Sequence, residues 1–199
     1  MRKLCAPLAL LVLLFATTVP AADPPRMSAE EKAAMEAMQK AMTPGASHKL
    51  LNPFVGTFNV TVSSWTAPGA KPMVSKGVST NKWIMGSRYV QQNFSGSFMN
   101  MPFTGVGYVG YDNVKQQYWS SWMDNMSTGM MTTTGSTPDG GKTFKFTGVM
   151  ADPMTGKDTT LEEHLTIKSK DEQVFEMWAP GPDGKTFKMM ELVYKRKKA

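Results

Sequence analysis

The amino-acid sequence predicts an all-β protein, an antiparallel up-and-down barrel of about ten strands that follows one N-terminal helix. Apolar and polar residues alternate with a period of two in most segments after residue 56. Turn residues separate these segments at hairpin spacing, and the similar stretches 138–146 and 182–189 each contain an Asp-Gly turn. Strands in series with short connections close most easily into a barrel, because closure leaves no strand edge exposed.

Residues 1–22 have the composition of a secretory signal peptide. Arg2 and Lys3 precede a compact apolar run at residues 8–15, and small residues follow at 19–22. The apolar run is shorter than the roughly 20 residues that a helix needs to cross a bilayer. We therefore predict cleavage near Ala22, a mature protein with no integral membrane segment, and a periplasmic or secreted location.

Residues 23–45 are predicted to form a linker and one amphipathic helix. Ser28 and Glu31 have the spacing of a capping box, and Met35, Met38 and Met42 recur at three- and four-residue intervals. The expected role is a lid or brace that packs on the barrel. The alternative is a methionine face for copper(I), because thioethers bind soft metals.

The barrel domain is predicted to span residues 46–199, with a short helical turn around His48 at its start. Gly86 is expected to form a bulge or kink within one strand. The strands are expected at residues 57–62, 74–80 and 83–94, three times in the meander 102–135, and at residues 144–146, 159–167, 174–178 and 186–196.

Charge and motifs exclude several classes of function. The net charge is a modest +6, and no basic stripe accompanies the aromatic residues, so no nucleic-acid partner is expected. The predicted mature chain has no cysteine, no nucleophile elbow and no paired-histidine zinc motif, and no cofactor is predicted. Gly141-Lys142-Thr143 resembles the end of a phosphate loop, but Ser136 replaces the first glycine of that motif and no helical pattern follows.

Carboxylates on apolar strand faces mark the candidate site. Glu163 lies between apolar residues, Glu191 shares a face with Met189, and Asp124 continues a face of aromatic residues. A buried carboxylate needs a partner or a wet cavity. Arg88, alone in an uncharged stretch, is expected to bridge one or two of them inside the barrel; the alternatives are a structural ion pair or a shifted register. The candidate ligand-binding residues are Arg88, Tyr118, Trp122, Asp124, Glu163 and Glu191.

The two histidines are expected to have structural positions. His164 alternates with apolar residues of its strand and should face solvent. His48, at the entry to the barrel, should cap or pack.

Residues 46–196 resemble the bacterial domain-of-unknown-function family 1579. The matching pieces are His48-Lys49-Leu50 before Gly56-Thr57-Phe58, then Gly86-Ser87-Arg88-Tyr89, Gly110-Tyr111-Asp112, Trp122-Met123-Asp124, Asp152-Pro153-Met154-Thr155-Gly156 and Pro182-Asp183-Gly184. The resemblance implies a lipocalin-like (calycin) barrel with no assigned activity, so no catalytic residue is carried over. Nitrobindin-type haem barrels are more distantly similar; their axial histidine lies near the C-terminal end of the barrel, where residues 186–196 contain none.

Three functions are compatible with these features. The first is a barrel that binds a small apolar or amphipathic ligand in the cell envelope. The second is a barrel filled by its own Phe, Trp and Met side chains, with a structural or protein-interaction role. The third, less favoured, is an enzyme or metal protein in which Asp124, Glu163 and Glu191 do acid–base work. Cavity volume separates the first two, and a converging carboxylate pair with a raised pKa would favour the third.

Overall fold

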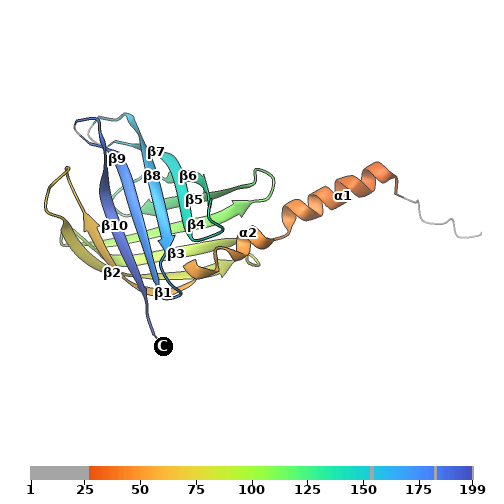
Figure 1. Cartoon of the computed structure of the whole chain (residues 1–199), viewed down its shortest axis with the longest axis horizontal. Coiled ribbons are helices and arrows are strands. Elements are labelled where there is room, and N and C mark those ends of the chain that lie inside the picture. The colour runs from red at the N-terminus through yellow and green to blue at the C-terminus, as the bar shows by residue number, and fades with distance from the viewer. Residues whose placement is uncertain (1–26, 153–154, 182, 199) are drawn as a thin grey trace, which may run out of the picture.

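The computed structural model describes residues 27–152, 155–181 and 183–198. The predicted signal peptide lies outside these residues. Within them the chain forms a closed antiparallel barrel of ten strands, in which each strand pairs with the next and β10 returns to β1 (Figure 1). This confirms the predicted fold class. The strands are β1 (Gly56–Ser64), β2 (Met73–Ile84), β3 (Tyr89–Phe98), β4 (Met101–Asp112), β5 (Gln117–Asp124), β6 (Met131–Ser136), β7 (Thr143–Ala151), β8 (Asp158–Ile167), β9 (Glu172–Pro180) and β10 (Thr186–Arg196).

One end of the barrel, here called the closed end, is plugged by the segment that precedes β1. This segment contains α2 (Ala46–Lys49) and the 3₁₀ turn η1 (Asn52–Phe54). Leu51 and Phe54 are fully or almost fully buried, and the Phe54 ring meets the Phe144 ring edge to face at 4.9 Å. The β2–β3, β4–β5, β6–β7 and β8–β9 turns lie at this end. The remaining hairpin turns surround the other, open end.

His48 and the C-terminal strand hold the plug in place. His48 is buried, and its Nδ1 accepts a hydrogen bond of 3.1 Å from the Gly45 N–H, which is the expected capping role. Arg196, on β10, donates to the carbonyls of Val55 (2.7 Å) and Pro53 (3.0 Å). The plug is therefore bonded to the strand that completes the barrel.

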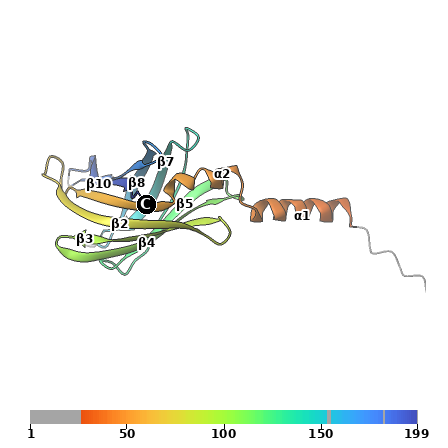
Figure 2. The same ribbon diagram turned by 90° about the horizontal axis from the view of Figure 1, so that it is seen from below.

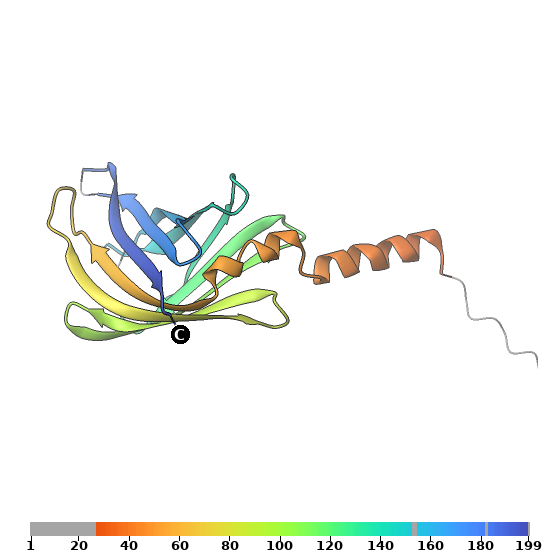
Figure 3. The same ribbon diagram turned by 60° about the horizontal axis from the view of Figure 1, so that its bottom comes forward.

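The N-terminal helix α1 (Ala29–Met42) begins as predicted, with Ser28 and Glu31 forming a reciprocal capping box. It does not pack as predicted. No residue of α1, all of which is described, is buried, and Figures 2 and 3 show the helix extending away from the closed end of the barrel. Met35 and Met38 are 59% and 65% exposed. The expectation of a lid or brace is wrong, because α2 and η1 already fill the closed end.

Among the described residues, side chains of two hairpin turns of the barrel donate hydrogen bonds to α1. The acceptors are carbonyls in the C-terminal turn of the helix and in the residue that follows it. Asn113, between β4 and β5, donates to the carbonyls of Lys40, Ala41 and Thr43 at 2.8–3.2 Å. Arg88, between β2 and β3, donates to the carbonyl of Met42 at 2.7 Å. These carbonyls have no partner within the helix, so the two side chains act as its C-terminal cap.

The β2–β3 turn corrects a predicted strand. Residues 83–94 were expected to be one strand with a kink at Gly86, but the chain reverses at residues 85–88. Met85, Gly86 and Ser87 all have positive φ, of 49°, 66° and 62°. Of these three residues, only the glycine indicates a positive φ from the sequence alone. Two of the three positions are occupied by residues that rarely adopt it, so the sequence pattern predicts the turn too early in the chain.

Candidate ligand-binding cavity

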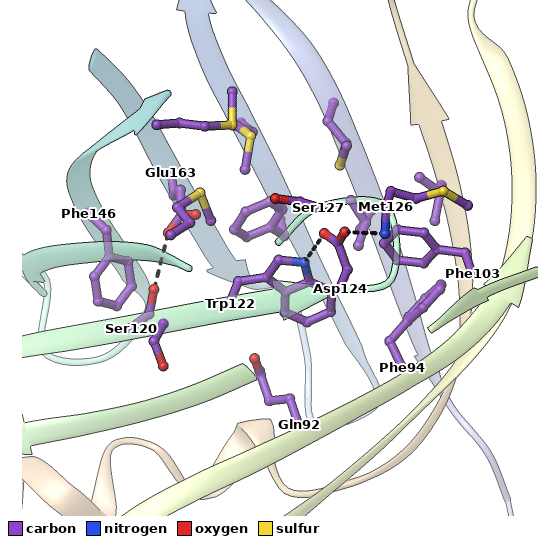
Figure 4. Close-up of a pocket in the computed structure, with 18 of the residues that line it drawn as sticks. Gln92, Phe94, Phe103, Ser120, Trp122, Asp124, Met126, Ser127, Phe146 and Glu163 are labelled. Carbon is purple, nitrogen blue, oxygen red and sulfur yellow. Dashed lines mark hydrogen bonds between the residues drawn. The ribbon is translucent and has the colours of Figure 1, made fainter. Parts of the chain in front are cut away.

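The open half of the barrel encloses a cavity of about 460 Å³. Its wall is mostly aromatic and aliphatic, and side chains from strands and from the β5–β6 loop point into it (Figure 4). The closed half is filled by the core described above, whereas the open half retains space. Prominent lining residues are Phe94, Phe103, Trp122, Phe146, Met177 and Met190.

Trp122 and Asp124 form one polar feature of the wall. The Trp122 Nε1–H donates to Asp124 Oδ2 at 2.9 Å, and the Met126 N–H donates to Asp124 Oδ1 at 2.9 Å (Figure 4). Both residues face inward from β5, as predicted, and line the cavity. Asp124 ends the strand, so its carboxylate also fixes the start of the β5–β6 loop.

Glycines on β4 make room for the indole. Gly105 and Gly107 are paired with Asp124 and Trp122 across the sheet. A Cβ atom on Gly105 would lie 2.2 Å from the Trp122 ring, and one on Gly107 would lie 2.9 Å from it. The ring therefore lies against bare backbone. The alternating glycines of β4 belong to the site because any side chain there would displace Trp122.

Glu163 is the second polar feature, and it faces inward from β8 as predicted. Its side chain is 3% exposed. Its Oε2 atom accepts hydrogen bonds from Thr133 Oγ1 at 3.1 Å and Ser120 Oγ at 3.5 Å, and these two hydroxyls lie 2.7 Å apart. No cation pairs with it among the described residues. Burial consequently raises the pKa of Glu163 from 4.5 to about 7.

Tyr194 on β10 lies in the same electrostatic environment. It lines the cavity, and burial together with the charge of Glu163 raises the pKa of its phenol above the usual range. The phenol therefore stays neutral at any physiological pH, as a hydroxyl in the wall.

Glu191 faces outward, contrary to prediction. A register shift between Lys188 and Met190 inserts an extra residue in β10, so that Met189 and Met190 both line the cavity. Beyond the shift, the inward positions are Met190 and Leu192, and Glu191 lies between them on the outer face. There it pairs with Lys188, which also bonds Glu176 at 2.9 Å. The expected shared face of Met189 and Glu191 is interrupted by this bulge.

Arg88 does not enter the barrel, so the expected bridge to an inward carboxylate is wrong. Its guanidinium donates to the carbonyls of Met85 and Met42 at the closed end. Tyr118 shares the inward face of β5, but it is buried in the closed-end core, where its hydroxyl donates to the Ser47 carbonyl at 2.9 Å. Of the six predicted residues, the structure brings three into the cavity: Trp122, Asp124 and Glu163.

Sequence reasoning missed the hydroxyls that orient Glu163. Ser120 could have been found, because it lies between Tyr118 and Trp122 on the same inward face. Thr133 is one of three consecutive threonines, and nothing in that run distinguishes the buried residue from its neighbours.

The described residues contain no group of three or more His, Cys, Asp or Glu side chains that could hold a metal ion. His164 lies on the outer face of β8, 3.8 Å from Glu162, and neither histidine lines the cavity formed by the described residues. None of the described helices is both long and apolar enough to span a membrane.

Comparison with one solved structure supports the fold. The crystal structure of Rv2717c from M. tuberculosis superposes with a TM-score of 0.55 at 14% identity, over 78% of this chain and 100% of that one. A redesigned β-barrel matches with a TM-score of 0.38 at 18% identity, over 79% of this chain and 99% of the design. At this level of identity the likeness to Rv2717c concerns the fold alone. No curated protein matches the chain.

The family assignment comes from the sequence. The family model described as "protein of unknown function (DUF1579)" matches residues 43–196, which include α2, η1 and all the strands described above. The chain belongs to the DUF1579 family of proteins of unknown function.

Proposed function

We propose that this protein binds a small apolar or amphipathic ligand inside its barrel, and that it does so in the periplasm or outside the cell. The observation that carries the proposal is the cavity of about 460 Å³ in the open half. This volume falls within the range of about 300–1,000 Å³ that is typical of small-molecule sites. A mostly apolar wall with a few polar groups is also typical of such sites.

The filled-barrel alternative fits only the closed half of the molecule. There, Leu51, Phe54 and Phe144 leave hardly any exposed surface. In the open half, Trp122 packs against a second apolar cluster that contains Phe94, and both residues still line unfilled space. The export part of the proposal rests on the signal-like composition of residues 1–22 and on the confinement of the single cysteine to that segment.

An acid–base role is the second candidate, because a carboxyl with a pKa of about 7 can both accept and donate a proton near neutrality. The two cavity carboxylates do not form a pair, however. Asp124 is bonded to Trp122 and Met126, and Glu163 to Ser120 and Thr133. This separation favours binding over catalysis.

The binding proposal can be tested with a neutral apolar fluorophore, N-phenyl-1-naphthylamine, and with a cavity-filling variant. Leu192 lines the cavity, and Val193 follows it on the outer face of β10. We expect saturable binding to the wild type, at least about tenfold weaker binding to Leu192→Trp, and unchanged binding to Val193→Trp. Equal binding to both variants, or none to the wild type, would support the filled barrel. Native mass spectrometry of protein from its own cell envelope would show a retained ligand.

A further inference from the structure

We propose that the polar group of the ligand is a cation, an amine or quaternary ammonium attached to an apolar body, and that Glu163 binds it. The inference deepens the proposed function, on which it rests, by naming the chemical class of the ligand. It is carried by the charges that line the cavity, the unused oxygen of Glu163 and the aromatic wall beside that oxygen.

The charges in the cavity all have one sign. Among the described lining residues, Asp124 and Glu163 are the ionisable carboxyls, and none is Lys, Arg or His. The chain as a whole carries six more positive than negative formal charges, so its cations lie elsewhere. A carboxylate or phosphate ligand would bring a further negative charge into this enclosed space, where repulsion is stronger than in water. A cation would be attracted to both residues.

One carboxylate oxygen of Glu163, Oε1, can accept a hydrogen bond from a ligand. Both of its hydrogen bonds end on Oε2, and within the described part of the chain Oε1 accepts none. Asp124 differs, because Trp122 and Met126 already occupy its two oxygens. Glu163 can therefore contact a ligand directly, with Ser120 and Thr133 holding the carboxylate in position. Asp124 contributes attraction from a greater distance along the wall.

The wall beside Glu163 suits an organic cation. Phe146 is its cross-strand partner on β7, and Figure 4 shows the Phe146 ring and the Trp122 indole on either side of Ser120, below Glu163. Aromatic faces attract alkylammonium groups. The apolar body of the ligand would extend toward Phe94 and Phe103, whose rings lie 5.7 Å apart. An inorganic cation would gain little from these surfaces.

Proton release should accompany binding. The other ionisable groups that line the cavity are Asp124 from β5 and Tyr194 from β10, while the described lining residues of the remaining strands contribute none. Without a cation, burial holds the pKa of Glu163 near 7, and a bound cation should lower it. The affinity for a permanent cation should therefore rise with pH through neutrality.

The test uses three competitors with the same octyl chain: octyltrimethylammonium, octanol and octanoate. Each displaces N-phenyl-1-naphthylamine from the folded wild-type protein. At pH 8 we expect the cation to compete at concentrations at least about tenfold lower than octanol, and octanoate to be the weakest. Because octyltrimethylammonium does not titrate, its affinity should increase about tenfold between pH 6 and pH 8 through Glu163 alone.

Glu163→Gln should reduce the preference for the cation over octanol by about tenfold and remove its pH dependence. Glu162→Gln, on the outer face of the same strand, is the matched control and should retain both. A wild type that binds the fluorophore but does not prefer the cation would overturn the inference while leaving the proposed function intact. A preference that survives in Glu163→Gln would overturn the role of Glu163. A wild type that binds no fluorophore would refute the proposed function itself.

Discussion

Replacing Glu163 by glutamine should stabilise the unliganded protein at neutral pH, by an amount that grows as the pH rises. The carboxyl is 3% exposed and has no cationic partner among the described residues, so the folded state favours its protonated form. In the unfolded chain it ionises near its ordinary pKa of 4.5, whereas in the folded protein it ionises at about 7. Between these values the folded state holds the extra proton. The stabilisation that this carboxyl contributes to the folded state is therefore fully present below pH 4.5. It is lost as the pH rises through 7.

The size of the effect follows from the two pKa values. Each pKa unit corresponds to about 1.4 kcal/mol, so a rise from 4.5 to about 7 amounts to about 3–4 kcal/mol in full, of which about 3 kcal/mol is expressed by pH 8. Glutamine keeps the shape and a hydrogen-bonding group but cannot ionise. Glu163→Gln should match the wild type near pH 4.5 and should exceed it by about 3 kcal/mol at pH 8.

Urea unfolding of both proteins from pH 4.5 to pH 8, with equal m-values, measures this difference directly. The pKa of His48 is lowered by burial, and its effect on stability cancels in the comparison because both proteins contain it. Glu162→Gln, at a position whose side chain is 56% exposed, should follow the wild type at every pH. Parallel curves for Glu163→Gln and the wild type would refute the assignment of a raised pKa to Glu163.

Three further predictions concern the cavity wall, the helix and the plug. Gly105→Ala would place a methyl group 2.2 Å from the present position of the Trp122 ring, so the indole should move, tryptophan emission should shift and fluorophore binding should weaken about tenfold. Gly45→Ala, whose Cβ would have no atom within 4 Å and which does not line the cavity, should leave all three unchanged. Arg88→Met should lower barrel stability by less than about 1 kcal/mol, because the lost hydrogen bonds are exposed, yet limited proteolysis after α1 should become faster. The His48 ring should titrate in NMR spectra below its usual 6.5, because burial disfavours the imidazolium.

The sequence predicted the site where strand alternation is uninterrupted. β8 pairs with β7 and β9 without a register shift. Alternation in the sequence around Glu163 therefore predicts correctly which side chains face inward. β10 contains a bulge, and an extra residue reverses every later side chain. The outward position of Glu191 follows from that single insertion. Period-two reasoning cannot detect a bulge whose extra residue, Met189 or Met190, is as apolar as its neighbours.

Arg88 shows a different difficulty. A lone cation in an uncharged stretch suggests a buried ion pair, but this stretch contains a turn whose positive φ angles fall mainly on non-glycine residues. Similarly, the capping box of α1 predicted where the helix begins, because capping is local. Its packing is not local. Whether a methionine face finds a partner depends on what already fills the closed end, which here is Leu51 and Phe54.

The pairing of β1 with β10 has a consequence for how the chain folds. Every other strand pair joins neighbours along the chain, so the meander from β1 to β10 grows by short-range hairpin steps. The last step brings Phe58 opposite Arg196, from opposite ends of the barrel domain, and its entropic cost is that of closing the longest loop. Arg196 then stacks on the Phe58 ring at 4.6 Å and bonds the carbonyls of the plug. A ribosome-bound chain that lacks this residue would present two unpaired strand edges, so the barrel can close only after β10 has been synthesised.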